Sequence, residues 1–485
     1  MSDVSAARLS ASIKPAEWLW LAAALLVGAL LVFWGLADKS PTPDEAFYYF
    51  ESIAPIPQLL HITIYDNFHP PLFYLIFHGV NAALHPPEPG FRYFTAAFHL
   101  LTILATWGLA RRWFGAAPAV IAAIVVASAP LLVAEARLFR MYAVVTALAT
   151  ASWWLLAIAQ EKQGAARRWI WLAYGALVLV MPYLLYLAAF VVAAQALYGI
   201  VNWRSARPAF FWALGACAAT IPWWWAVRIQ MPGGAFPNAT IEGWRVATDV
   251  LLSTPPDAWR TPAVYASVTL LAIAIIVAGS WLARSTALPF MFIPLALQVV
   301  LSVVLHKDLV VHRYLTLSVP AFALALTACI ASLAVTRARL VAVAILVVVL
   351  GSSAVALADV MADPYYQTTD WYAIEIALHQ HAAPSDALVF DQWGPTLVLQ
   401  GSPDVRGHDV YRISSSSPPQ NAIEWIDEHP AARVWYVENL VGAWDPQRIV
   451  AAHLRATRPL LYSLTQPHAA AADDVLLQLY GSRGH

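Results

Sequence analysis

Two acids stand side by side just beyond the first apolar segment of the chain. Asp44 and Glu45 follow a Pro-Thr-Pro step, where a membrane helix would meet water. Ionisable groups are costly at such a boundary and usually serve a function, and a carboxylate there can act as a general base towards an acceptor hydroxyl. The structural alternative is an interfacial helix with acids in its first turn, facing the positive end of the helix dipole. We interpret both acids as catalytic and expect Asp44 to be the base.

A second polar stretch follows further along the chain. It places Asp66 and His69 before Pro70 and Pro71. Adjacent prolines fix the backbone and can open a helix. His69 can orient a phosphate or the acceptor, or it can tie the loop down, and the sequence leaves both roles open. We assign Asp66 and the two prolines to ordering of the loop.

Two later stretches contain cations suited to a phosphate. Arg137 and Arg140 are three residues apart, which predicts one shared helix face, and arginine can bind phosphate through two parallel hydrogen bonds. Arg313 opens a predicted helix, an unfavourable place for a cation unless an anion lies near. The alternative for the first pair is arginines that snorkel to the interface. The predicted donor-binding residues are His69, Arg137, Arg140, Tyr142, His312, Arg313 and Tyr314, with Glu135 ordering the charge network.

The composition sets these residues in a membrane protein. Hydrophobic residues make up 60% of the 485 residues and charged residues 12%, and the mean hydropathy is +0.61. No soluble domain of this length would bury so much apolar surface in one core. The net charge of -1 gives no indication of a nucleic-acid partner. Cys217 and Cys329 lie in apolar runs, which indicates small hydrophobes rather than a disulfide or metal ligands.

Apolar runs near bilayer length predict about eleven transmembrane helices. They cover residues 18–36, 91–110, 115–132, 141–159, 169–181, 183–201, 208–227, 262–283, 286–305, 314–335 and 340–358. The first run is too long for the core of a signal peptide, so we expect it to be retained. Basic residues mark alternate loops, which predicts a cytoplasmic N-terminus and an extracytoplasmic C-terminal region.

Two further regions complete the expected architecture. A long first outer loop over 38–90 contains a short apolar segment, 70–84, which we interpret as a juxtamembrane or re-entrant helix because a full crossing would invert every later basic loop. After residue 360 polar residues return, and 361–485 is predicted to form a soluble α/β domain with strands at 387–390, 433–437 and 475–480. Residues 1–360 form the transmembrane catalytic domain.

The charged residues are expected at the outer ends of the crossing runs and not within them. This pattern argues against a transporter or flippase, which would usually keep ionisable groups near the midplane. His99 is the exception, and a lone histidine in a helix is more often a structural residue bonded to a neighbour. The layout therefore favours group transfer from a lipid-linked phosphate at the outer surface.

With these residues set out, the chain resembles the GT-C glycosyltransferases that use polyprenyl-phosphate sugars, specifically protein O-mannosyltransferases and the bacterial aminoarabinose transferases of lipid A. The resemblance covers residues 15–360 and rests on the acid pair Asp44-Glu45, the step His69-Pro70-Pro71-Leu72, the block Arg137 to Tyr142 and the late Arg313-Tyr314-Leu315. It implies that Asp44 activates the acceptor and that Arg137, Arg140 or Arg313 neutralises the leaving phosphate. It also implies inversion of the sugar, with no metal and no cofactor.

The expected function is inverting transfer of a sugar from a polyprenyl-phosphate donor to an acceptor hydroxyl or phosphate at the outer face of the cytoplasmic membrane. The partners are the lipid-linked donor, a lipid, glycan or protein acceptor, and membrane lipid, without nucleic acid. Two alternatives stay open: a ligase or polymerase that uses polyprenyl-diphosphate glycans, and a transporter or flippase of lipid-linked sugars. A ligase has less need of a base in the first outer loop.

Overall fold

The structure is a computed structural model. It describes residues 14–65, 69–87, 89–230, 262–283, 285–306, 309–362, 369–391, 396, 398–399, 402, 404–414, 416–439, 445–466 and 475–483. The chain forms two compact units, Met1–Leu36 with Ser52–Met361 and Ala37–Glu51 with Ala362–His485. Residues 37–51, which the sequence analysis placed in the transmembrane domain, group with the C-terminal unit.

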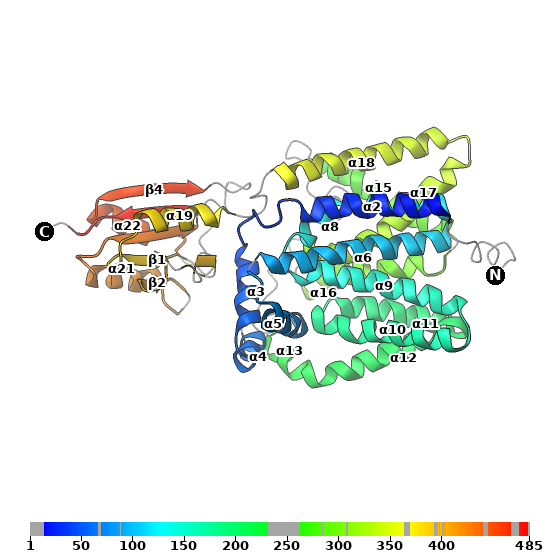
Figure 1. Cartoon of the computed structure of the whole chain (residues 1–485), viewed down its shortest axis with the longest axis horizontal. Helices are drawn as coiled ribbons and strands as arrows, with labels where there is room; N and C mark the ends of the chain where they lie inside the picture. Colours follow the sequence, from blue (N-terminus) through cyan, green and yellow to red (C-terminus); the bar gives the residue numbers. More distant parts are fainter. Residues whose placement is uncertain are drawn as a thin grey trace. The chain divides into compact units, whose positions relative to one another are not determined.

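The first unit is a bundle of helices (Figure 1). Its long helices are α2 (Pro15–Phe33), α6 (Gly90–Trp113), α9 (Met141–Glu161), α10 (Gly164–Leu184), α12 (Trp203–Thr220), α15 (Pro262–Leu282), α17 (Val319–Ala334) and α18 (Arg339–Ala362). Shorter elements are α7 (Ala116–Ala127), α8 (Pro130–Ala136), α11 (Ala188–Val201), η1 (Ile221–Trp223), α13 (Trp224–Gln230), η4 (Leu288–Phe292), α16 (Ile293–Leu305) and η5 (His312–Ser318). Every predicted apolar run is thus helical.

Seven of the described helices are long and apolar enough to cross a membrane, or eight if the pair α7 and α8, bent by 53°, counts as one span. The prediction of a polytopic helical membrane protein is confirmed, whereas the count of about eleven crossings stays a prediction. The first outer loop contains α3 (Pro43–Ile53), α4 (Ile56–Tyr65) and α5 (Leu72–Leu84). The last of these has 13 residues, short for a crossing.

Small residues let the helices approach closely. Gly108 of α6 lies against Trp154 of α9, where an added Cβ would come within 2.3 Å of the indole. Gly279 of α15 lies against the backbone of Ala325 in α17, where an added Cβ would be 2.4 Å from the carbonyl oxygen. Small residues at helix contacts are typical of membrane bundles, because close backbone approach replaces the hydrophobic drive that lipid cannot supply.

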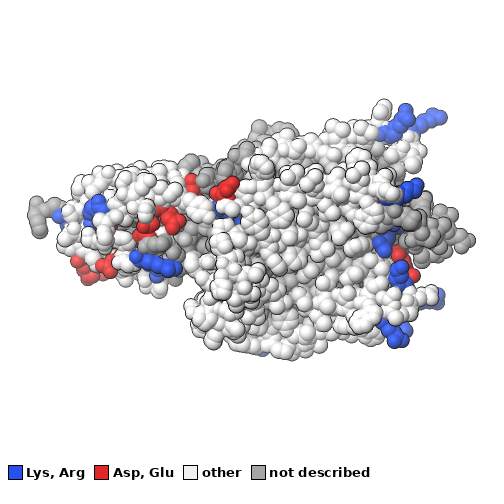
Figure 2. Space-filling view, in the orientation of Figure 1, with Lys and Arg blue, Asp and Glu red and all other residues white. Residues whose placement is uncertain are grey.

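Basic residues gather at one end of this bundle. Figure 2 shows Lys and Arg side chains there and a largely uncharged lateral surface. Arg111 pairs with Glu17 at 2.7 Å and Arg112 with Glu161 at 3.4 Å, which ties the ends of α2, α6 and α9 together. The basic end is the one expected to face the cytoplasm.

The second unit contains a mixed five-stranded sheet in the order β2-β1-β3-β5-β4. The strands are β1 (Ala387–Phe390), β2 (Asp409–Arg412), β3 (Val434–Asn439), β4 (Leu460–Gln466) and β5 (Val475–Tyr480). β1 pairs in parallel with β2 and β3, and β5 pairs antiparallel with β3 and β4. The small α/β domain and its three predicted strands are confirmed, and β2 and β4 are additional.

Helices cover both faces of this sheet. α19 (Trp371–His381) packs on the face that includes Trp435 and Leu477, and α21 (Pro419–Glu428) with α22 (Ile449–Thr457) packs on the face that includes Tyr436. Apolar side chains of β1 and β3 therefore alternate between two cores.

One buried carboxylate joins the start of β1 to β3. Asp386 accepts hydrogen bonds from Arg433 Nη2 at 2.6 Å and from Trp435 Nε1 at 3.0 Å. Its Oδ2 also accepts from the backbone N–H of Ala383 at 2.9 Å. Burial raises the pKa of the Asp386 carboxyl, but the hydrogen bonds from Arg433, Ala383 and Trp435 outweigh burial and lower that pKa below its ordinary value.

We predict that Asp386→Asn destabilises the second unit by about 1.5–3 kcal/mol, the range for hydrogen bonds to a charged group. Because the folded carboxyl has a lowered pKa, its stabilisation is present above the ordinary aspartate pKa and is lost as the pH falls through the folded pKa. Amide exchange in β1 and β3 of the full chain should be faster in the variant at neutral pH. The difference from the wild type should shrink in acid; equal exchange rates at neutral pH would contradict the assignment.

Candidate functional site

The predicted catalytic acids open helix α3. Glu45 is buried, its carboxylate accepts from the N–H of Thr42 at 2.9 Å, and its own N–H donates to Thr42 Oγ1 at 3.2 Å. This reciprocal pair is a capping box, which satisfies backbone donors at the start of the helix. Asp44 lies half-buried in the same first turn. Glu45 therefore has a structural role, and it fixes the turn that presents Asp44.

The arginine block lies at a break in the bundle. α7 and α8 are bent by 53°, Arg137 caps the C-terminus of α8, and Arg140 adopts an extended conformation directly before α9. The prediction that Arg137 and Arg140 share a helix face is wrong, because the chain turns between them to enter α9. Glu135 lies buried in α8.

Arg137 binds the end of helix α2. Its Nη1 donates to the carbonyls of Leu31 at 2.9 Å and Trp34 at 2.7 Å, and the residue is 8% exposed. The last carbonyls of a helix have no partner within the helix and form the negative end of its dipole. An arginine there stabilises them both by hydrogen bonding and by its positive charge. Arg137 thus holds the turn between α8 and α9 against α2.

Sequence reasoning missed a second arginine at the same place. Arg92, the second residue of the run 91–110, was not singled out, although it stands in the first turn of α6. Arg92 is completely buried in α6 and donates from Nη1 to the carbonyl of Leu36 at 3.2 Å. An arginine one residue into an apolar run was the available signal, since such a charge is expensive unless it has a partner.

Arg140, Tyr142, Tyr314 and Arg313 form a continuous series of contacts. Arg140 Nη2 donates to Tyr142 Oη at 3.3 Å, and its guanidinium lies 5.0 Å from the ring centroid. The rings of Tyr142 and Tyr314 are 5.8 Å apart, and the Arg313 guanidinium lies 5.7 Å from the Tyr314 ring. Tyr142 of α9 and Tyr314 of η5, 172 positions apart in sequence, are thereby brought together.

The structure describes the remaining predicted residues to different extents. Pro70 and Pro71 are buried, and Pro71 directly precedes α5, so the prolines stand at a helix start. Their role in ordering the loop stays a prediction. His69 is partly buried. Asp66 lies outside the described residues, and of His312 the structure describes only the backbone, in η5.

His99 has a structural partner. It is buried in α6, and its Nε2 lies 3.3 Å from the carbonyl oxygen of Ala127 at the end of α7. That carbonyl belongs to the break before α8, where helical hydrogen bonding stops. The interpretation of His99 as a residue bonded to a neighbour agrees with this contact.

The arrangement is suited to an anion. Arg140 is 5% exposed and Arg313 is partly buried, and a guanidinium in such surroundings binds phosphate oxygens more strongly than one in water. Among the described residues, no three His, Cys, Asp or Glu side chains lie close enough together to hold a metal ion.

Comparisons with known proteins agree with this architecture. Residues 68–225 match the family model of dolichyl-phosphate-mannose-protein mannosyltransferase, which includes the arginine block. No curated protein sequence matches the chain.

Solved structures match along nearly the whole chain. ArnT from Cupriavidus metallidurans bound to undecaprenyl phosphate is 16% identical, with 96% of this chain and 98% of that chain covered and a TM-score of 0.54. The Archaeoglobus fulgidus oligosaccharyltransferase in the apo form is 12% identical, with 92% and 73% covered and a TM-score of 0.55. At these identities the likeness shows the fold.

We predict that Arg137→Ala lowers the stability of the protein by roughly 1.5–3 kcal/mol, the range for hydrogen bonds from a charged donor, because two carbonyls at the end of α2 lose their partner. Arg137→Lys should recover part of the loss. The readout is the thermal unfolding midpoint in detergent, with the exposed Arg337→Ala as the matched control. An unchanged midpoint for Arg137→Ala would show that the residue does not anchor α2.

Proposed function

We propose that this chain, a glycosyltransferase of the GT-C fold, transfers a sugar from a polyprenyl-phosphate donor to an acceptor hydroxyl or phosphate, with inversion at the anomeric carbon. The resemblance stated from the sequence is confirmed by the family model and the similar folds. The observation that carries the proposal is the contact series from Arg140 to Arg313, which gathers two guanidinium groups and two phenols from distant stretches.

The position of this series suits an extracytoplasmic reaction. Arg140 directly precedes α9, whereas Glu161 at the other end of α9 belongs to the basic end. A helix of 21 residues is about 31 Å long, close to the thickness of a bilayer core. With the basic end in the cytoplasm, Arg140 faces the opposite side. We place the protein in the cytoplasmic membrane, with its N-terminus inside and the C-terminal domain outside.

In the proposed reaction Arg140 and Arg313 bind the donor phosphate, and Asp44 takes the proton of the acceptor hydroxyl. The acceptor oxygen then forms a bond to the anomeric carbon while the bond from that carbon to the phosphate oxygen breaks. The electron pair leaves with the polyprenyl phosphate, whose charge the guanidinium groups stabilise. A single displacement inverts the sugar.

The other predicted residues support this step. Tyr142 and Tyr314 hold the arginines in place, and Glu45 holds the first turn of α3. His69 and His312 are proposed to bind the donor phosphate, and Arg137 anchors the turn that positions Arg140. Membrane lipid surrounds the bundle, and the acceptor is a lipid, glycan or protein.

Two alternative functions compete with this one. A ligase or polymerase using polyprenyl-diphosphate glycans would also use the arginine series, but it would not depend on a base in the first outer loop. A transporter or flippase would need a polar path between the two ends of the bundle. Among the described residues of α6 and α9, charged side chains stand near the helix ends and none lies between them, which favours chemistry at a surface over a polar path through the bundle.

We predict that Asp44→Asn reduces transfer from a polyprenyl-phosphate sugar by about 10²–10⁴-fold, because the variant lacks the general base. Binding of undecaprenyl phosphate should be unchanged. Turnover of the purified protein and lipid binding are measured side by side, with Glu45→Gln as the neighbouring control for a structural effect. Transfer near the wild-type rate would exclude Asp44 as the base and favour the ligase.

We predict that Arg140→Ala and Arg313→Ala each weaken transition-state binding by about 1.5–3 kcal/mol, which is about 10–100-fold in kcat/KM. The reason is that the leaving phosphate loses one charged donor. Exposed Arg339→Ala at the basic end is the matched control and should retain wild-type kinetics. An equal loss in the control, or none in either variant, would place the donor phosphate elsewhere.

A further inference from the structure

The residue before the Pro-Thr-Pro step is bound to the start of a helix in the C-terminal domain. Ser40 is fully buried, and its Oγ donates to the carbonyl of Thr369 at 2.8 Å. The same Oγ accepts from the N–H of Trp371 at 3.2 Å. The two partners lie 329 and 331 positions further along the chain. All three residues belong to the second unit, so these hydrogen bonds, the Ser40 contact, are part of its own fold.

The Ser40 contact satisfies a helix terminus. Trp371 is the first residue of α19, and the first N–H groups of a helix have no partner within it. Asp370 accepts from the N–H of Ala373 at 3.0 Å, and Ser40 accepts from that of Trp371. The Trp371 N–H also donates to the carbonyl of Thr369 at 3.0 Å, which closes a small ring of hydrogen bonds. The Ser40 hydroxyl is thus held as both donor and acceptor.

This contact reaches the core of the domain. Residues 37–38 are exposed, whereas Ser40 is buried against its partners. The side chain of Trp371 is 2% exposed and belongs to the core that includes Trp435 and Leu477. Protein interiors are close-packed, so a residue of that core has little room to move. Ser40 is therefore held by a rigid part of the second unit.

The stretch from Ser40 to Asp44 has little freedom of its own. Its sequence is Ser-Pro-Thr-Pro-Asp, and each proline fixes its own φ at about −65° and restricts the residue before it. Pro41 is buried, Pro43 begins α3, and Thr42 forms the capping box described above. A displacement of Ser40 would therefore be carried to the first turn of α3, which contains Asp44.

We infer that Ser40 is a positioning residue for the transfer reaction: it fixes the Pro-Thr-Pro segment to the start of α19, so that the C-terminal domain sets the orientation of Asp44. This inference rests on the proposed function, since it needs Asp44 to be the base. Ser40 acts through Asp44 and takes no part in proton transfer. The C-terminal domain orients the base in this scheme, while the arginine series binds the phosphate.

The chemistry makes such positioning important. A general base must lie within hydrogen-bond reach of the proton that it takes. Asp44 is half-buried and has a short side chain, so the backbone of the first turn decides where its carboxylate lies. A displacement of about 1 Å can lower a rate by about 10²-fold. Loss of the Ser40 contact should therefore reduce turnover more than it reduces donor binding.

Kinetics of the full chain test this expectation. Ser40→Ala should lower kcat by about 10–100-fold, because the base is displaced. The KM for the polyprenyl-phosphate sugar should be unchanged, since the arginine series is intact. The matched control is Asp445→Ala, which removes a helix cap elsewhere in the domain: Asp445 accepts from the N–H groups of Ile449 and Val450, both at 3.0 Å. The control should retain the wild-type kcat. An equal loss in both variants, or none in Ser40→Ala, would overturn the inference.

A second variant tests the segment without removing the Ser40 hydroxyl. Pro43→Gly leaves the Ser40 contact in place and frees the backbone directly before Asp44. It should lower kcat by about tenfold or more for the same reason. A wild-type kcat in Pro43→Gly would show that the segment does not orient the base.

A double-mutant cycle separates positioning from a general structural effect. If Ser40 acts through Asp44, Ser40→Ala should cause no further loss in the residual transfer of Asp44→Asn. An independent structural effect would multiply with the loss in Asp44→Asn. Multiplied losses would therefore overturn the inference.

Amide exchange tests the contact without reference to the reaction. The N–H of Ala46 donates to the carbonyl of Thr42 at 3.0 Å in the first turn of α3. Its exchange should be about fivefold faster or more in Ser40→Ala, which reflects the loss of a hydrogen bond that holds this turn, and unchanged in Asp445→Ala. Unchanged exchange in Ser40→Ala would overturn the inference.

These readouts distinguish failure of the inference from failure of the proposed function. Wild-type transfer in Asp44→Asn would reject the base, and with it the role of Ser40, even if exchange in α3 still depended on the contact. Loss of transfer in Asp44→Asn together with wild-type kinetics in Ser40→Ala would retain the transferase and reject the positioning role alone.

Discussion

The carbonyls at and just beyond the end of α2 impose a constraint on which the rest of the first unit depends. A helix that ends in an apolar setting leaves carbonyls that neither water nor the helix can satisfy. Arg92 and Arg137 donate to the carbonyls of Leu36, Leu31 and Trp34. These bonds run from α6 and from the turn after α8 to the end of α2. Three segments distant in sequence are therefore held together by hydrogen bonds to these carbonyls. Arg92 and Arg137, two buried charges that would be costly in a membrane protein without partners, thus bind the end of α2.

Fixing that turn has a consequence for the reacting groups. Arg140 stands three residues after Arg137, in an extended conformation that starts α9. With Arg137 held against α2, Arg140 has little freedom, and Tyr142 restricts it further through a hydrogen bond and its ring face. Preorganised donors of this kind cost no rearrangement when charge develops on a leaving phosphate. The structural arginine and the proposed binding arginine thus have separate tasks within one short turn.

Much of this could be predicted from the sequence, and the failures have physical causes. Apolar runs identified the helices because a helix that crosses the bilayer core needs about 20 predominantly apolar residues. The shared face of Arg137 and Arg140 was wrong because spacing alone does not show where one helix ends and the next begins. Thr42 and Glu45 show the spacing of a capping box, which predicts a structural role for Glu45 from the sequence. Strand β2 was missed because it is short and polar, and β4 because it is largely exposed, although its Tyr462 and Leu464 pack against the core.

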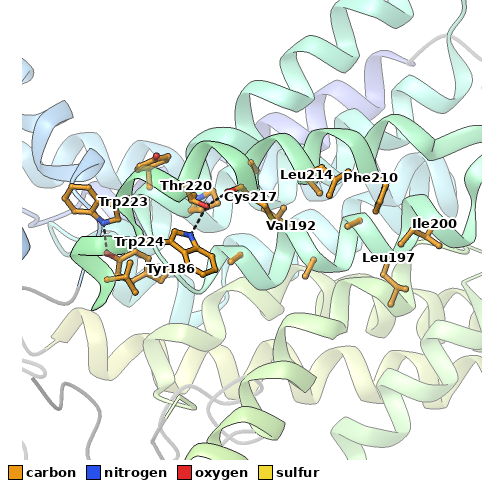
Figure 3. A pocket seen from close by; sticks show the side chains of 18 residues that line it. Tyr186, Val192, Leu197, Ile200, Phe210, Leu214, Cys217, Thr220, Trp223 and Trp224 are labelled. Atoms are coloured by element: carbon orange, nitrogen blue, oxygen red, sulfur yellow. Dashed lines mark hydrogen bonds between the residues drawn. The ribbon is translucent and has the colours of Figure 1, made fainter. Parts of the chain in front are cut away.

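A groove lined by apolar side chains of α11 and α12 (Figure 3) and the arginine series are connected through one helix. Helix α16 contacts α11, which lines the groove, and it also contacts η5, which contains Arg313. Gln298 of α16 is fully buried, and its Nε2 lies 3.4 Å from the carbonyl of Tyr314. A buried polar side chain is costly unless it forms hydrogen bonds, and this contact joins α16 to η5. The groove and the arginine series are thus joined through the packing of α16, whose Gln298 holds the backbone next to Arg313.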